Sequence, residues 1–188
     1  MTEDLPQEIK TDRLLLRRWR ESDGPLFAQM NADPKVMECF PSLLTREESD
    51  ESMRRICEHF DEHGFGLWAV EVPGTAEFIG YVGLKYPTWQ AWFTPCVEVG
   101  WRIDSRYWGN GYAPEAAKAS LEFAFHAAGL NEIYSFTVPH NLRSRRVMEK
   151  IGMTHLQEHD FAHPILAPDH PLSRHVLYRI SRSDFARS

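Results

Sequence analysis

A glycine-containing segment near the middle of the chain has the spacing of an anion-binding site. The pattern Arg-x-x-Gly-x-Gly-x-Ala, residues 106–113, follows a β-branched and aromatic run that ends at Ile103 and precedes an amphipathic run over 114–128. Glycines let backbone N–H groups approach a phosphate closely, and the first turn of a helix leaves its own N–H groups unpaired. The segment therefore predicts a phosphate cradle between a strand and a helix.

Two common phosphate loops do not fit this segment. A dinucleotide loop requires Gly-x-Gly-x-x-Gly, but Pro114 occupies the place of the third glycine. A nucleotide-triphosphate loop requires Gly-Lys followed by Ser or Thr, which the segment lacks. These mismatches leave a pyrophosphate cradle of another type.

Composition narrows the class of protein. The 188 residues, 43% of them hydrophobic, suit a single globular domain over 1–188. A net charge of −6 argues against nucleic acid or an anionic membrane as the main partner, although Arg143, Arg145 and Arg146 form a local basic patch that could hold phosphate. The three cysteines are widely spaced, so we expect neither disulfides nor a metal site. Without a leader or a long apolar run, a cytoplasmic protein is expected.

Hydrophobic periodicity and turn residues predict the elements that position the cradle. Thr45 and Glu48 have the spacing of a capping box, and residues 73–76 separate two strands that should form a hairpin. Loops are expected over 85–95 and 161–171. Strands are predicted at 13–19, 66–72, 77–84, 96–103, 132–138, 153–156 and 176–180, and helices at 21–30, 45–64, 114–128 and 141–151. This order indicates a mixed α/β domain.

Three further blocks of sequence accompany the glycine segment. They are Thr-Asp-Arg-Leu-Leu-Leu-Arg at 11–17, Val-Glu-Val-Gly-Trp-Arg-Ile at 97–103, and Asn141-x-x-Ser144 followed by Met-Glu-Lys-Ile-Gly-Met at 148–153. With these blocks in this order, nearly the whole chain resembles the GCN5-related N-acetyltransferase superfamily, and within it the ribosomal-protein N-acetyltransferase branch. The resemblance implies an α+β fold: a mixed, mostly antiparallel sheet, splayed between its fourth and fifth strands and flanked by about four helices.

The same resemblance implies the donor and its binding residues. Acetyl-coenzyme A would be the cosubstrate, with no metal involved. Its pantetheine arm would lie in the splayed gap along the backbone of Trp101, Arg102 and Ile103. The pyrophosphate would rest on main-chain donors of Arg106, Trp108, Gly109, Asn110, Gly111, Tyr112 and Ala113.

The implied reaction is direct attack of a neutral amine, from a protein N-terminus or a small molecule, on the thioester. At pH 7, deprotonating a lysine-like amine costs roughly 4 to 5 kcal/mol and an α-amine only about 1 kcal/mol. A strong base is therefore nearly dispensable for α-amines. Glu98 is the candidate base, directly or through water, because its strand face should look into the cleft; a salt-bridged structural carboxylate is the alternative.

The leaving thiolate lacks the acid that many relatives use. They carry a tyrosine four residues before the glycine that ends this helix, where this chain has Met148. Ser144, one turn earlier, is the candidate replacement, against an ordinary role in the first turn of the helix. Asn141 is expected to cap the same helix and to bind cofactor or substrate.

The acceptor carries no motif. Trp89, Trp92 and Phe93 are candidates for shaping its site, and one of the five histidines between 155 and 175 could line it, whereas His59 and His63 suit a solvated helix end better than a metal site. A coenzyme A-binding module without turnover and a nucleotide-binding regulatory domain are alternative functions. The chain is a monomer or a homodimer, since the C-terminal strand could pair between subunits or close the sheet.

Overall fold

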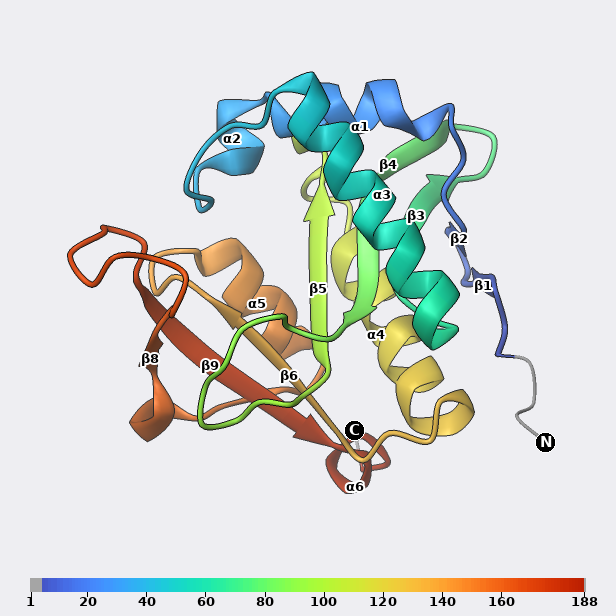
Figure 1. Cartoon of the computed structure of the whole chain (residues 1–188). Helices are drawn as coiled ribbons and strands as arrows, with labels where there is room; N and C mark the ends of the chain where they lie inside the picture. Colours follow the sequence, from blue (N-terminus) through green and yellow to red (C-terminus); the bar gives the residue numbers. More distant parts are fainter. Residues whose placement is uncertain (1–4, 188) are drawn as a thin grey trace.

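A twisted sheet forms the centre of the computed structural model, which describes residues 5–187 (Figure 1). Within these residues nine strands pair in the order β1-β2-β3-β4-β5-β6-β9-β7, and β8 also pairs with β9. All neighbours are antiparallel except β5 and β6. The strands are β1 (Ile9–Lys10), β2 (Leu15–Arg17), β3 (Leu67–Val72), β4 (Ala76–Lys85), β5 (Glu98–Ile103), β6 (Glu132–Thr137), β7 (Thr154–His155), β8 (Phe161–Ala162) and β9 (Arg174–Ser181).

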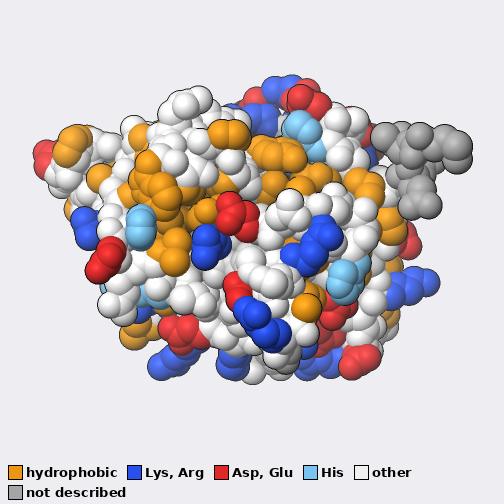
Figure 2. Space-filling view, turned by 90° about the horizontal axis from the view of Figure 1, so that it is seen from below, with side chains coloured by type: hydrophobic (Ala, Val, Ile, Leu, Met, Phe, Trp, Pro, Cys, Tyr) orange, Lys and Arg blue, Asp and Glu red, His pale blue; other side chains and the backbone are white. Residues whose placement is uncertain are grey.

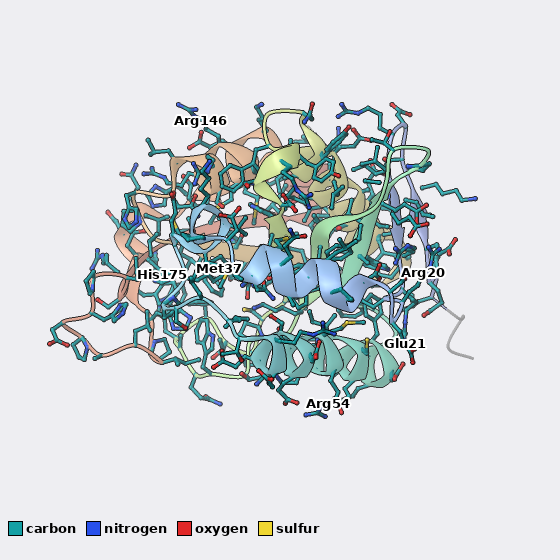
Figure 3. The ribbon with its side chains drawn as sticks, turned by 90° about the horizontal axis from the view of Figure 1, so that it is seen from above. Arg20, Glu21, Met37, Arg54, Arg146 and His175 are labelled. Atoms are coloured by element: carbon teal, nitrogen blue, oxygen red, sulfur yellow. The ribbon has the colours of Figure 1, made fainter. Side chains whose placement is uncertain are left out.

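Helices cover both faces of this sheet. Seen from above, α1 and α3 lie side by side on one face, and α4 and α5 lie on the other (Figure 3). The helices are α1 (Asp23–Asn31), α2 (Pro34–Met37), α3 (Arg46–His63), α4 (Tyr112–Glu122), α5 (Leu142–Lys150) and α6 (Arg182–Phe185), and a π-helical turn (Phe123–Ala127) continues α4. The four longer helices match the predicted ones. None of the helices in residues 5–187 has the length and apolar character that a membrane crossing requires.

The predicted helix ends of α3 are confirmed. The Thr45 hydroxyl accepts the Glu48 N–H at 3.1 Å, and the Glu48 carboxylate accepts the Thr45 N–H at 2.8 Å, which completes a capping box. Gly64 ends the helix with a φ of 74°. The short α2 was not predicted, although Asp33 caps it and Pro34 opens it, which are ordinary signals for a helix start.

Two glycines let the central strands approach closely. The hairpin of β3 and β4 forms as predicted. A Cβ on Gly80 would lie 2.1 Å from the Arg102 carbonyl oxygen, and one on Gly83 would lie 2.2 Å from the Gly66 carbonyl oxygen. Because no side chain fits there, Gly80 lets β4 approach β5 closely and Gly83 lets it approach the start of β3. Five of the six residues of β5 line the cavity described below.

Two sequence predictions need correction, and an alternative left open for the C-terminal strand is decided. The strand expected over 13–19 is three residues long, with β1 beside it. The loop expected over 161–171 contains β8, because a two-residue strand is too short to produce an alternating pattern. The C-terminal strand β9 pairs with β6 along one edge and with the short strands β7 and β8 over part of the other, so it closes this sheet. Whether the chain is a monomer or a homodimer stays a prediction.

The sheet splays between β5 and β6, which are the fourth and fifth of the predicted strands, as expected. These two strands share one register pair, Glu98 with Tyr134. The Tyr134 N–H donates to the Val97 carbonyl at 2.9 Å, and the Ser135 hydroxyl donates to the Val99 carbonyl at 2.9 Å. Beyond these bonds the strands separate, which leaves unpaired backbone on both sides of a cleft.

Candidate active site

A single cavity of about 580 Å³ follows the gap between β5 and β6. It extends from the loop before α4 to the segments 38–41 and 163–172. Its wall contains five basic side chains against two acidic ones, on a chain whose net charge is −6. The basic residues are Lys85, Arg102, Arg143, Arg146 and Lys150, and the acidic ones are Glu38 and Glu98. The cavity therefore suits an anionic ligand.

The loop before α4 collects backbone donors at one end of this cavity. Gly109 and Gly111 have φ values of 80° and 79°, which few other residues adopt. Within residues 5–187 no hydrogen bond is made by the backbone N–H groups of Gly109, Asn110, Gly111, Tyr112 or Ala113. Several free donors thus surround the N-terminus of α4, and the loop has the chemistry of a pyrophosphate cradle.

The N-terminal block of sequence braces this loop. The Glu115 carboxylate accepts hydrogen bonds from the Thr11 hydroxyl at 2.6 Å and from the Arg13 Nε at 2.7 Å. Arg13 in turn donates to the Asn110 carbonyl oxygen at 2.9 Å. Burial opposes ionisation of Glu115, but these bonds outweigh it and lower its pKa. No pattern in the sequence predicts this brace, because its partners lie about a hundred residues apart.

Arg106 faces away from the cavity. Its backbone N–H donates to the Asp104 carboxylate at 2.9 Å, and its guanidinium binds the same carboxylate at 2.6 to 3.1 Å. These two residues line a separate hollow with Asp33 and Ser105. Because Asp104 uses the Arg106 N–H to cap the turn at Ser105–Tyr107, this geometry does not support Arg106 as a pyrophosphate donor.

Only one of the three predicted pantetheine residues offers a free backbone edge. Alternate residues of β5 share an edge, and the Val97 and Val99 carbonyls face β6, so the Trp101 N–H and C=O also face the cleft. The Ile103 carbonyl lies on this edge too but accepts the Trp108 Nε1–H at 2.8 Å. Arg102 points its backbone toward β4, opposite Tyr81. Trp101 is thus the residue that could pair with an extended ligand.

The hydroxyl group of Ser144 lines the cavity. The Ser144 Oγ accepts hydrogen bonds from Trp101 Nε1 at 3.3 Å and from Asn141 Nδ2 at 3.1 Å. The Asn141 carbonyl oxygen caps α5 by accepting the Ser144 N–H at 3.2 Å, as predicted. With both lone pairs engaged, the Ser144 hydroxyl proton is free to be donated. Met148 is buried in the same wall and has no proton to supply.

Glu98 lies across the cleft and is buried, with an exposed fraction of 7%. Its Oε2 is 3.3 Å from the Lys85 ammonium, a partner that the sequence did not suggest. Burial raises the pKa of Glu98, although Lys85 acts in the opposite direction, and Glu98 raises the pKa of Lys85. A carboxylate whose proton affinity is increased at a cavity wall is suited to accepting a proton.

The cavity wall outside the loop carries basic side chains from α5. Arg146 and Lys150 line the cavity and form no ion pair within residues 5–187, and Arg146 projects from the α5 side of the molecule (Figure 3). Arg143 also lines the cavity, where it pairs with Glu38 and lies 4.2 Å from the Trp108 ring. Arg145 instead binds the Tyr178 hydroxyl and the Pro139 carbonyl. The predicted basic patch is thus divided between cavity and scaffold.

The far end of the cavity is lined by Phe40, Tyr81, Phe136, His163 and His175. The His163 Nδ1 accepts the Ile165 N–H, so its proton is carried on Nε2. Burial, with His175 and Lys85 nearby, lowers the pKa of His163 to about 4. His163 and His175, whose pKa values are both lowered by burial, therefore add aromatic surface without charge near pH 7.

The aromatic loop over 85–95 was predicted to shape this end of the cavity. In the structure its aromatic residues lie behind the residues that line the cavity wall. Trp89 and Phe93 pack against Phe136 and Phe161, and neither borders the cavity. Trp92 is 59% exposed. Hydrophobic side chains do gather on the lower face of the molecule, where this loop and α6 lie in Figure 1 (Figure 2). The loop thus packs behind Phe136, and its aromatic residues do not line the cavity.

The end of α3, where His59 and His63 were expected to be solvated, is more buried than predicted. The Tyr86 N–H donates to His59 Nε2 at 3.1 Å, so the His59 Nδ1 carries the proton and donates to the Phe65 carbonyl at 3.0 Å. His59 also packs against His63, with ring centroids 4.4 Å apart. Burial lowers the pKa of His59. These rings are structural parts of the packing between α3 and the end of β4.

Comparison with known proteins bears on this geometry. Residues 13–154 match the family model described as an acetyltransferase (GNAT) domain. The chain is 33% identical over 164 residues to the FsC-acetyl coenzyme A-N(2)-transacetylase of Aspergillus fumigatus, covering 84% of this chain and 69% of the relative. It matches the structure of a GNAT-family acetyltransferase from Bacillus anthracis with a TM-score of 0.77 at 27% identity, covering 94% and 99% of the two chains. The ribosomal-protein-S5-alanine acetyltransferase from Vibrio fischeri shares the fold, with a TM-score of 0.73 at 19% identity and coverage of 95% and 98%.

Proposed function

The chain belongs to the GNAT acetyltransferase family, and from that premise we propose how its own residues carry out acetyl transfer to a primary amine. The activity itself, an acetyl-coenzyme A-dependent N-acetyltransferase, follows from the family and confirms the prediction from sequence. The observation that supports the site assignment is that free loop donors, a free Trp101 edge, Ser144 and Glu98 line one continuous cavity.

The donor half of the cavity fits coenzyme A in three respects. The unpaired N–H groups between Gly109 and Ala113 suit the pyrophosphate, with Arg146 and Lys150 as nearby cations. The Trp101 edge of β5 suits the amides of an extended arm, which would add like a short strand. A helix terminus contributes only about 0.3 to 1 kcal/mol at a surface, so the convergent N–H groups must provide most of the anchoring.

The bound thioester supplies an activated acetyl group. Glu98 would accept the proton that the nitrogen of the neutral amine loses as it attacks, directly or through water, and Lys85 favours the ionised form of Glu98 despite its burial. As nitrogen bonds to the carbonyl carbon and the carbon–sulfur bond breaks, the Ser144 hydroxyl would donate a hydrogen bond to the departing thiolate. The thiolate would then take a proton from solvent, and Glu98 would return its proton to solvent. A thiol pKa near 8.5 makes this assistance modest, which is consistent with Met148 replacing a stronger acid.

The acceptor is proposed to be a primary amine, a small molecule or a protein N-terminus. The relative from Aspergillus is named for transfer from acetyl coenzyme A to an N(2) atom, and a structural neighbour is named for a ribosomal-protein alanine. We also propose a cytoplasmic location, which the three free cysteines support.

The test combines purified protein with acetyl-coenzyme A and a panel of α-amines and lysine-like amines, with free thiol measured over time. Saturable release of thiol that depends on both the amine and the protein is expected. Tight acetyl-coenzyme A binding without release on any amine would instead favour the non-catalytic module. Competition by ATP or NAD would favour a nucleotide-binding domain.

A further inference from the structure

We propose that the acceptor amine also carries a carboxylate, which is bound by the guanidinium of Arg102. The proposal deepens the proposed function, on which it rests, by naming the substrate class. The sequence does not suggest it, because the resemblance to the family implies only a backbone role for Arg102 beside the pantetheine arm.

Arg102 is held in place by partners that leave its charge intact. Its Nη1 donates to the Asn31 side-chain oxygen at 2.6 Å, and its guanidinium carbon lies 4.0 Å from the centre of the Phe40 ring and 5.5 Å from that of Tyr81. Asn31 is itself fully buried and anchored to Ser49. The guanidinium is thus oriented in advance at the cavity wall.

The charge of Arg102 has no counter-ion. Within residues 5–187 it forms no ion pair, and its buried Nε makes no hydrogen bond. The other cations of the inner wall differ, because Lys85 pairs with Glu98 and Arg143 pairs with Glu38.

An internal comparison shows what an enclosed arginine ordinarily receives in this protein. Arg17 is almost fully buried and binds Asp23 through two parallel hydrogen bonds of 2.8 and 2.9 Å, with Glu71 as a further partner. A partly buried cation without such a partner is unfavourable. A ligand carboxylate would supply to Arg102 what Asp23 supplies to Arg17.

The position of Arg102 relative to Glu98 indicates how such an acceptor would lie. The two residues are four apart on β5 and therefore share a face, about 13 Å apart at their Cα atoms. Gly100, between them on that face, has no side chain to obstruct a ligand. An acceptor lying over Gly100 would place its amine toward Glu98 and its carboxylate toward Arg102. Amine and carboxylate should then be separated by several bonds.

The experiment measures carboxylate preference within each protein variant. Acetyl transfer would be followed for glycine, 4-aminobutyrate, 5-aminopentanoate and 6-aminohexanoate, each paired with its neutral primary amide. We expect the longer acids to exceed their amides in kcat/KM by roughly 10-fold or more. Arg102→Gln should reduce this ratio toward one, and Arg102→Lys should retain part of it. Because both members of a pair are measured on the same variant, a general loss of folded protein does not change the ratio.

Two further measurements keep the outcomes separate. Arg54→Gln, which alters an exposed arginine of α3 outside the cavity, should leave the ratio unchanged. Binding of the same acids and amides to the complex of wild-type protein with coenzyme A would be measured by calorimetry. An equal affinity or kcat/KM for acid and amide, or a ratio unaffected by Arg102→Gln, would overturn the carboxylate site while leaving acetyl transfer intact. Failure of acetyl-coenzyme A to bind, by contrast, would overturn the proposed function.

Discussion

The two ends of the cavity are built in different ways. The proposed donor end, residues 107–113 and the start of α4, offers backbone N–H groups that one continuous segment supplies. The acceptor end is made of side chains from β4, β5, the segment 38–41 and the loop between β8 and β9. Backbone donors recognise a group common to every reaction, whereas side chains can be exchanged singly without disturbing the fold. The donor end therefore indicates the family to which the chain belongs, whereas the acceptor end should determine which amine the individual enzyme uses.

The largest effect should come from breaking the donor end alone. Gly111→Trp places a side chain in a loop with a φ of 79°, where even a Cβ lies 3.4 Å from Arg13. The loss of two or three convergent hydrogen bonds should raise the Kd for acetyl-coenzyme A by roughly 30- to 100-fold. Tryptophan fluorescence or calorimetry would measure it.

A matched control separates this effect from backbone strain. Gly74 has a similar φ of 75° but lies in the β3–β4 turn, where a Cβ would have no atom within 4 Å. Gly74→Trp should leave the Kd for acetyl-coenzyme A unchanged. Equal affinity of the Gly111→Trp and wild-type proteins would refute the pyrophosphate assignment.

A smaller effect, on kcat, is expected from a substitution at Ser144, between the donor end and the acceptor end of the cavity. Ser144→Ala removes the hydroxyl hydrogen-bond donor while Asn141 and Trp101 remain, so kcat should fall by about 10-fold with little change in the Kd for acetyl-coenzyme A. Steady-state kinetics beside equilibrium binding would show this difference. An unchanged kcat in the alanine variant would show that Ser144 is not the hydrogen-bond donor to the thiolate and has only a structural role in the first turn of α5.

The effect of Glu98→Gln should depend on the amine. Because burial raises the pKa of Glu98, its protonation should limit kcat/KM at a pH above the usual carboxyl range. The glutamine variant should lose this acidic limb and should slow lysine-like amines several-fold more than α-amines, since they need more help with deprotonation. Profiles measured from pH 5 to 9 would test this. An unaltered profile would make Glu98 structural.

The smallest effect concerns stability at the acceptor end. His163 has a pKa lowered to about 4, against an ordinary value near 6.5, so the unfolded chain binds the proton more readily in this interval. The stability that neutral His163 provides above pH 6.5 should be lost as the pH falls toward 4. His163→Phe should therefore show a smaller decrease in Tm on acidification, with the Kd for acetyl-coenzyme A unchanged. His140→Gln, at an exposed position outside the cavity, should show the same decrease in Tm on acidification as the wild-type protein.

Much of the fold was predictable because its signals are local. The capping box at Thr45, the Asn141 cap and the glycines that end helices each involve residues within a few positions of one another. The long strands show alternation. The splayed sheet was implied by the resemblance to the acetyltransferase family that the four blocks carry. The two-residue strands β1 and β8 and the four-residue α2 were not predicted, because so few residues carry no periodic pattern.

In the candidate site, too, features that depend on local spacing were predictable and features that depend on distant contacts were not. The sequence by itself determined the loop at 106–113, the position of Glu98 on β5 and the proximity of Asn141 to Ser144, since each depends on spacing along one segment. Only the tertiary structure decided that Arg106 turns to Asp104, that Lys85 pairs with Glu98, and that Arg102 stands beside Asn31 without a counter-ion. The physical reason is that ion pairing and burial depend on which distant segments the sheet brings together, and no local pattern encodes that choice.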